Sequence, residues 1–515
     1  MPTGSNTTRI AKNTLLLYFR MLLTMGVTLY TSRVVLDVLG VEDYGIYNVV
    51  GGVVAMFGIL SGSLSSAISR FITFELGKGD FEKLKKIFCT SVNIQVILIA
   101  IITILMETIG IWFLNAKMVI PPERLQAANW VFQFSVVTFA LNLLSVPYNA
   151  VIIAHEKMSA FAYISIIDCT LKLIVAFIIA YNPFDKLVYY GLLIMIVGLI
   201  NRTMYAVYCK RHFEEATYSM VFDKGLMKEM FGFAGWNFIG SSSALLRDQG
   251  GNILLNLFFG PIVNAARGIA MQVSSAATAF VNSFMTAVNP QITKSYAAGE
   301  YDYMMKLVFQ SAKFSYFIML LVALPIFVCT PYVMDIWLKE VPEHTIILVR
   351  LTLIFILNEC LANSLRTLSH ATGNIRNFQL VVGGIQMLNF PISYVALKFG
   401  AQPECLYFVA ILIAFFCELG RLLILKQMVN LSVCKFLKDI YFLSILVAIL
   451  SALTPWFLRS YFDNSFVSFI ILSAFSCVNV MIISYAIGCT KEDKMTIKMA
   501  IRKVSNRFFR GDRHH

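Results

Sequence analysis

Residues 72–86 read ITFELGKGDFEKLKK, and residues 292–306 read ITKSYAAGEYDYMMK. A shift of 220 residues (292 − 72) aligns these two stretches without a gap, and it places Gly79 on Gly299 and Lys86 on Lys306. The same shift continues outward and pairs further residues, namely Gly40 with Gly260, Ala67 with Ala287, Glu123 with Glu343 and Pro183 with Pro403. The alternative is a chance match among common apolar residues. Because several matches are glycine, proline or charged residues at turns, they favour an internal duplication.

The composition excludes a soluble globular protein. Of the 515 residues, 58% are hydrophobic and 14% are charged, whereas soluble domains carry about 25% charged residues. Each apolar run is long enough to cross a hydrocarbon core of roughly 30 Å. We therefore predict an all-α polytopic membrane protein of about fourteen transmembrane helices, at 14–38, 44–70, 87–114, 125–154, 160–181, 187–209, 231–259, 264–289, 307–332, 345–370, 377–397, 405–427, 440–459 and 466–488.

Lysine and arginine alternate between successive loops. One set of loops, together with both ends of the chain, holds about 25 of them and the other set about 6, which predicts cytoplasmic termini by the positive-inside rule. The polar start and the long first apolar run predict a retained membrane helix rather than a signal peptide. Six spans fall within each repeat, so both halves should insert with the same orientation, as parallel repeats.

The predicted parts of the chain follow from this topology. They are an N-lobe at 1–209, a cytoplasmic linker at 210–230, a C-lobe at 231–430, two additional spans at 431–490 and a basic cytoplasmic tail at 491–515. Apolar residues at helical spacing beside lysine and arginine predict that the tail is an amphipathic helix on anionic lipid, with a solvated disordered tail as the alternative. Duplicated halves in a membrane protein are typical of transporters that bind substrate between them.

Four arginines lie inside predicted spans, where a charge costs several kcal/mol unless it faces a cavity or a partner. They are Arg20, Arg33, Arg247 and Arg267. Guanidinium groups suit phosphate oxygens, so these four are the predicted substrate-binding residues of a cationic cavity. Snorkelling to the head groups is the alternative, and it suits Arg33 and Arg267, near the outer end, better than Arg247.

Three intramembrane carboxylates, Asp248, Glu359 and Glu418, are candidates for coupling transport to a proton or sodium gradient. Asp248 is adjacent to Arg247 and points about 100° away on an ideal helix, so the two are not an obvious pair.

Structural pairing is the alternative role of these acidic residues. Residues three or four positions apart share a helix face. Glu418–Arg421 and Asp168–Lys172 are expected to pair readily on that basis. Glu359 and Arg366 are two turns apart and are expected to pair less easily.

The span at 231–259 is unusually rich in small residues, including Gly240, Gly250 and Gly251. Small residues allow close helix packing and also permit bending. Flexing of this helix during transport and tight packing alone are both consistent with the sequence.

No motif indicates an enzyme or a resident cofactor. The ten cysteines lie mostly in apolar runs without CxxC spacing, which predicts no disulfide and no metal site. GxSxG, HExxH, Walker A and DxD patterns are absent, and the outer loops are short. The positive charge follows the loop alternation, so nucleic acid is not an expected partner.

Four stretches carry a family resemblance, namely 13–20 (NTLLLYFR), 39–47 (LGVEDYGIY), 69–71 (SRF) and 75–80 (ELGKGD). They resemble the Wzx-type polysaccharide and O-antigen flippases of the MOP superfamily, relatives of the MATE exporters and of the lipid II flippase. The resemblance is strong over about the first ninety residues, and the repeated topology extends it over most of the chain. Twelve spans are usual in such flippases, and the two extra spans here resemble the lipid II flippase arrangement.

The resemblance implies two six-helix lobes around a cavity lined largely by helices one, two, seven and eight. It implies alternating access that moves an undecaprenyl-diphosphate-linked oligosaccharide, as in lipopolysaccharide synthesis, across the bacterial inner membrane, with glycan-assembly machinery as a partner. Arg20 and Arg247 would hold the diphosphate, and Arg33 and Arg267 would receive it nearer the outer face. A MATE-like exporter of organic cations is the main alternative. A major-facilitator transporter and a membrane scaffold are weaker ones.

Overall fold

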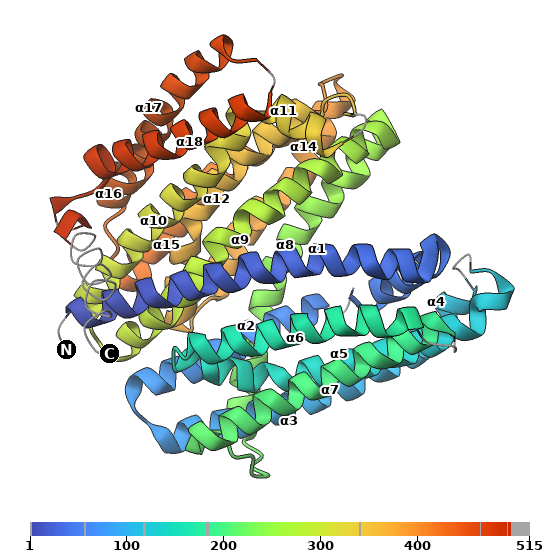
Figure 1. The fold of residues 1–515 in the computed structure, drawn as a ribbon. Coiled ribbons are helices and arrows are strands. Elements are labelled where there is room, and N and C mark those ends of the chain that lie inside the picture. The colour runs from blue at the N-terminus through green and yellow to red at the C-terminus, as the bar shows by residue number, and fades with distance from the viewer. Residues whose placement is uncertain are drawn as a thin grey trace, which may run out of the picture. The chain divides into compact units, whose positions relative to one another are not determined.

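The computed structural model describes residues 3–55, 58–116, 120–181, 185–338, 341–463, 465–491 and 493–495 (Figure 1). Within those residues the chain is almost wholly helical and contains no strand, so the all-α prediction is confirmed. The helices are α1 (Thr3–Ala55), α2 (Gly58–Lys78), α3 (Phe81–Leu105), α4 (Ile111–Ala116), α5 (Leu125–Ala154), α6 (Met158–Ile178), α7 (Lys186–His212), α8 (Lys224–Phe259), α9 (Pro261–Ala297), α10 (Tyr301–Val328), α11 (Thr330–Trp337), α12 (Thr345–Thr372), α13 (Arg376–Met387), α14 (Asn389–Lys398), α15 (Cys405–Val429), α16 (Val433–Phe436), α17 (Leu443–Leu458) and α18 (Phe466–Ile483).

All fourteen segments expected to span the membrane are helical where they are described, apart from single turn residues at Cys329 and Leu388. Eleven helices of the described chain are long and apolar enough to cross a bilayer. The three other expected spans, 44–70, 231–259 and 264–289, lie on α1–α2, α8 and α9 and carry more small and polar residues. The predicted amphipathic tail at 491–515 falls outside the described residues, apart from Lys491 and 493–495.

The chain divides into two compact units. The N-terminal unit is Leu15–Phe238, and the C-terminal unit is Met1–Thr14 with Ile239–His515, so the division falls inside α8. The non-helical part of the linker is short, because α7 continues to His212 and α8 begins at Lys224. This linker is attached to α3 by two hydrogen bonds of 2.8 Å, from the Tyr218 hydroxyl to Asn93 Oδ1 and from Asn93 Nδ2 to the Val221 carbonyl.

Two glycines of each half adopt the same left-handed backbone. Gly40 (φ 79°) breaks α1, and Gly260 (φ 77°), at the matching repeat position, separates α8 from α9. Gly79 (φ 79°) and Gly299 (φ 78°) likewise follow α2 and α9. A residue with a Cβ atom is strained at these angles. The four glycines are therefore turn positions that the duplication has retained.

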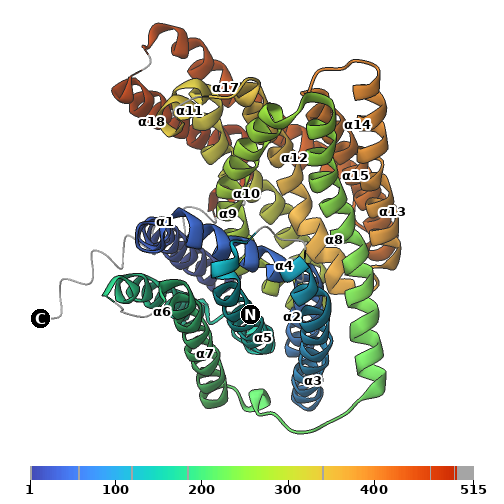
Figure 2. The same ribbon diagram turned by 90° about the vertical axis from the view of Figure 1, so that its right-hand side faces the viewer.

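Helix packing within each unit follows the same repeat. The central helix α5 packs against α2, α3 and α7, and its repeat partner α12 packs against α9, α10 and α15 (Figure 2). The helix starts agree as well, since Phe81 and Tyr301 begin α3 and α10, and Leu125 and Thr345 begin α5 and α12. Two bundles of the same internal arrangement result. In the C-terminal unit, α17 and α18 pack against each other and against α10 (Figure 1).

The starts of the two central helices are held by equivalent polar contacts. Arg124 precedes α5 and forms ion pairs with Asp43 and, at 2.5 Å, with Asp185 at the start of α7. His344, at the matching repeat position before α12, has Nδ1 2.6 Å from Glu404 Oε1 at the start of α15. The same helix-to-helix connection is thus made by arginine in one half and histidine in the other.

Candidate functional site

The C-terminal unit contains a polar cavity of about 290 Å³ between membrane-spanning helices. Residues of α8, α9, α12, α14 and α15 contribute most of its lining. The charged lining residues are Arg247, Asp248, Arg267, Glu359 and Arg366, and the neutral polar ones are Ser274, Thr278, Asn282, Thr352, Asn363, Asn389 and Tyr407. Three arginines and two carboxylates leave one positive charge in excess.

Arg247 is bound to its neighbour Asp248. Its Nε donates to Asp248 Oδ1 at 2.8 Å and its Nη2 donates to Oδ2 at 3.2 Å. The expectation that these residues do not pair is therefore wrong, because the long arginine side chain turns back along the helix surface to reach the carboxylate. The Arg247 guanidinium also lies 4.9 Å from the centre of the Phe355 ring. The positive charge of Arg247 is thus largely neutralised before any ligand arrives.

Arg267 is buried, with 3% of its surface exposed. The alternative of snorkelling to the head groups does not hold for Arg267, because its Nη2 donates to the Asp248 carbonyl on α8 at 3.0 Å. No acidic residue of the described chain pairs with it, and its Nε and Nη1 have no hydrogen-bond partner there. Gly251 provides the space, since an added Cβ at that position would lie 2.2 Å from Arg267 Nη1.

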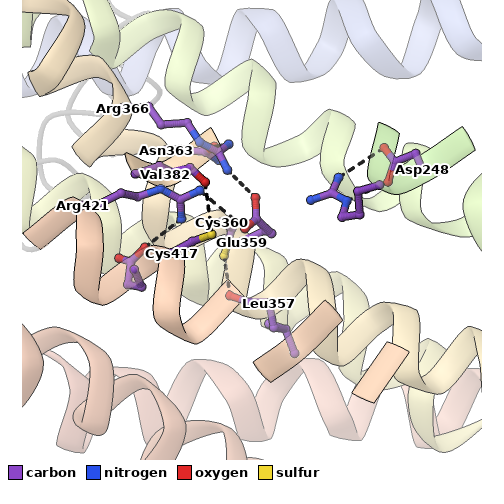
Figure 3. Close-up of polar contacts among 11 residues, drawn as sticks. Asp248, Leu357, Glu359, Cys360, Asn363, Arg366, Val382, Cys417 and Arg421 are labelled. Carbon is purple, nitrogen blue, oxygen red and sulfur yellow. Dashed lines mark hydrogen bonds and ion pairs between the residues drawn. The ribbon is translucent and has the colours of Figure 1, made fainter. Parts of the chain in front are cut away.

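The remaining charges form a network across α12 and α15 (Figure 3). Glu359 accepts a hydrogen bond from Arg366 and lies 3.8 Å from Arg421 Nη2. Arg421 Nη1 donates to Glu418 Oε2 at 3.1 Å, and both of these side chains are buried. The expected pairs Glu359–Arg366 and Glu418–Arg421 are confirmed, whereas the link between helices through Arg421 and Glu359 was not foreseen. In Figure 3, Asp248 lies apart from this network.

The other two predicted arginines belong to the N-terminal unit and do not line this cavity. Arg20 Nη1 donates to Ser165 Oγ at 3.2 Å, and its guanidinium lies 4.6 Å from the centre of the Phe161 ring. Arg33 is exposed. The expected Asp168–Lys172 pair forms at 2.8 Å.

The neutral polar lining was not predicted from the sequence. Ser274, Thr278 and Asn282 recur at intervals of four along α9, and Phe355, Glu359 and Asn363 do so along α12. Such spacing places each set on one helix face. Polar residues recurring every four positions inside an apolar helix are the signal that would have indicated Ser274, Thr278, Asn282 and Asn363, whereas Glu359 was already a candidate because of its charge.

Polar faces on helices that span the membrane, arranged around a cavity, define a multi-pass membrane transporter. Residues 10–296, more than half of the chain, match the Polysaccharide biosynthesis protein family, and residues 251–395 match the MatE family. The chain belongs to the Polysaccharide biosynthesis protein family. The resemblance to Wzx-type flippases of the MOP superfamily is confirmed, and the protein is a transporter rather than an enzyme.

Solved structures of MOP superfamily transporters share this fold. An outward-facing multidrug resistance MATE transporter has a TM-score of 0.72 at 13% identity, with 84% of this chain and 98% of that chain covered. A MOP transporter from Pyrococcus furiosus, described with reversed polarity of its binding pocket, has a TM-score of 0.69 at 15% identity, with 84% of this chain and 98% of that chain covered. A MATE protein in complex with MaD3S gives 0.70 at 15% identity over 84% and 100%. No curated protein sequence matches the chain.

Proposed function

We propose that this transporter moves an undecaprenyl-diphosphate-linked oligosaccharide from the cytoplasmic to the outer leaflet of the bacterial inner membrane. The polar cavity within apolar helices is the observation that carries the proposal. A sugar head group cannot cross hydrocarbon without replacing its hydrogen bonds to water. A protein that provides those hydrogen bonds inside the membrane, and leaves the polyprenyl chain in lipid, removes that barrier. Family membership supports the same substrate class.

Alternating access of the two units is the proposed mechanism, with both chain termini in the cytoplasm. Arg20, Arg33 and Arg267 are the proposed contacts of the diphosphate, since none of them forms an ion pair with a carboxylate in the described chain. Arg247 is a weaker candidate because Asp248 already occupies its guanidinium. Arg247 and Arg267 lie on α8 and α9, which hold two of the three less apolar spans. The third, 44–70, follows the span that holds Arg20 and Arg33.

Coupling to a proton or sodium gradient is the remaining part of the proposal. Asp248 and Glu359 each have an arginine bound to them, as does one oxygen of Glu418. The second oxygen, Glu418 Oε1, is buried without a hydrogen-bond partner in the described chain. We therefore propose Glu418 as the coupling carboxylate. The replacement Glu418→Gln should abolish the dependence of transport on the ion gradient.

Deletion of the gene tests the proposed function. The mutant should lose surface glycan and accumulate the lipid-linked oligosaccharide on the cytoplasmic side, and the wild-type chain should restore export. Normal surface glycan in the deletion strain would refute the proposal. Export of organic cations is the alternative, and it predicts unchanged glycan with increased sensitivity to cationic drugs. The excess of one arginine in the cavity disfavours cationic ligands.

A further inference from the structure

The charges in the cavity of the C-terminal unit are suited to one phosphate group of the diphosphate rather than to both. A diphosphate esterified at both ends carries two negative charges and presents oxygen atoms that accept hydrogen bonds. Asp248 and Glu359 line the same cavity, and both are acceptors that repel an anion. The two arginines beside them, Arg247 and Arg366, are already bound to these carboxylates. The cavity therefore favours a ligand that carries no more than one negative charge.

The neutral lining matches a ligand that both donates and accepts hydrogen bonds. Asn282, Asn363 and Thr278 offer amide and hydroxyl groups to the cavity, beside the paired charges. A sugar hydroxyl can donate to a carboxylate and accept from an amide or guanidinium in the same complex. Phe355 and Tyr407 also line the cavity, and each ring already has a guanidinium near its centre, Arg247 at 4.9 Å and Arg267 at 5.8 Å.

The cavity also retains one cation without an anionic partner. Arg267 is buried, and only its Nη2 is hydrogen bonded in the described chain. Asn389, buried on α14, has an Nδ2 group that is likewise without a partner there, and it lines the same cavity. Both groups are donors. A buried cation without an anion is costly in a membrane protein, so Arg267 is suited to an oxyanion, and Asn389 offers a further donor in the same cavity.

We propose that this cavity binds a sugar ring of the transported glycan together with one oxyanion attached to that ring. Arg267 and Asn389 bind the oxyanion, and the amide and hydroxyl side chains bind the ring. The oxyanion is either the phosphate joined to the first sugar or the carboxylate of an acidic sugar. This assignment rests on the proposed function and adds to it the part of the substrate that the C-terminal unit recognises.

Binding to the full-length protein in lipid nanodiscs tests the assignment without requiring transport. The probes are a panel of common hexose 1-phosphates, the corresponding hexoses and hexuronic acids, inorganic phosphate and pyrophosphate. We expect at least one sugar 1-phosphate or hexuronic acid to bind about tenfold more tightly than phosphate or pyrophosphate. A preference for the 1-phosphates identifies phosphate as the oxyanion, and a preference for the uronic acids identifies a carboxylate.

Two variants and a control locate the binding. Asn282 is exposed and lines the cavity, so Asn282→Leu should weaken the binding of the sugar probes without changing the thermal unfolding temperature. Arg267→Gln should lower the affinity for the charged probes to that for the neutral hexose. Gln402→Leu replaces an exposed amide that does not line the cavity and should change nothing.

Three outcomes would overturn the assignment. They are a preference for pyrophosphate over every sugar probe, no binding by the whole panel, and sugar binding that Asn282→Leu and Arg267→Gln both leave intact. The proposed function fails separately, if the deletion strain exports normal glycan. If the deletion strain loses its glycan but the purified protein binds only pyrophosphate, the proposed subsite is refuted and the proposed flippase function stands.

Discussion

At the residue scale, charges buried in apolar surroundings determine much of the structure. The sequence reveals which charged residues lie in membrane spans, and the pairs at helical spacing, such as Glu418–Arg421, could be predicted. The partners of Arg247 and Arg267 could not. Arg247 reaches its own neighbour through side-chain length, and the environment of Arg267 depends on how α8 packs against α9. Neither effect is encoded in residue spacing along one helix.

Removal of one member of the Arg247–Asp248 pair should be more harmful than removal of both. Arg247→Ala leaves the partly buried Asp248 carboxylate without its cation, which should cost about 1–3 kcal/mol in stability. The double variant Arg247→Ala/Asp248→Ala leaves no unpaired charge and should recover much of the protein level in the membrane. Immunoblots of membrane fractions, read beside surface glycan, measure both effects. Equal loss in the single and double variants would show that the pair does not stabilise the fold.

A buried ion pair outside the cavity anchors the segment that follows α18. Lys313 Nζ lies 2.9 Å from Asp493 Oδ2, and both side chains are buried. Burial alone would raise the pKa of Asp493, but Lys313 and the Thr490 backbone N–H stabilise the carboxylate and hold that pKa below its usual value. The pair therefore contributes its stability above the ordinary carboxyl pKa and loses it as the pH falls through the lowered value.

Asp493→Asn should destabilise the C-terminal unit because Lys313 remains buried without an anion. The expected loss is roughly 3–5 kcal/mol, measured as a lower thermal unfolding temperature of the purified protein at neutral pH. Lys313→Met/Asp493→Leu is the matched control and should unfold at a temperature closer to that of the wild type. If Asp493→Asn unfolds at the same temperature as the wild type at neutral pH, the pair contributes little to stability.

At the element scale, Gly250 and Gly251 of α8 are explained by close contacts where the helix meets its neighbours. Added Cβ atoms at Gly250 and Gly251 would lie 2.6 Å from Phe390 Cδ2 and 2.2 Å from Arg267 Nη1, whereas Gly232 has no atom within 4 Å. The sequence indicated either packing or bending. Packing accounts for Gly250 and Gly251, and flexing of α8 during transport stays a prediction.

Gly251→Ala should displace Arg267 and so impair the cavity. Crowding of this kind costs about 1–3 kcal/mol, and we expect reduced glycan export together with a lower unfolding temperature. Gly232→Ala adds a methyl group to the same helix in open space and should be neutral or slightly stabilising, by up to about 1 kcal/mol. Both glycine variants behaving alike would contradict the assigned contact.

At the scale of the whole molecule, the internal duplication was the feature best predicted from the sequence. Gly40 and Gly260 occupy the same backbone conformation, and the central helices α5 and α12 have matching packing partners. The helix-forming segments follow directly from apolar length, so nearly all of them could be predicted. The cavity could not, because it arises from the packing of five helices whose polar residues are far apart in the sequence.

The orientation of the chain in the membrane can be measured with a native thiol. Of the ten cysteines, Cys434 alone is exposed, and it lies just after α15 on the side predicted to be cytoplasmic. A membrane-impermeant maleimide should leave it unlabelled in intact cells and label it in inverted membrane vesicles, with Cys434→Ser as the control. Labelling in intact cells would reverse the predicted topology.

Reconstitution of transport tests the central claim most directly. The purified protein would be placed in liposomes that contain a labelled undecaprenyl-diphosphate oligosaccharide, and the fraction of its glycan accessible to an external glycosidase would be followed with time. The account predicts that glycan protected inside the liposomes becomes accessible to the glycosidase in the presence of the wild-type protein. With Arg267→Gln it should become accessible much more slowly. Accessibility no greater than in protein-free liposomes, from a protein that is correctly folded, would contradict it.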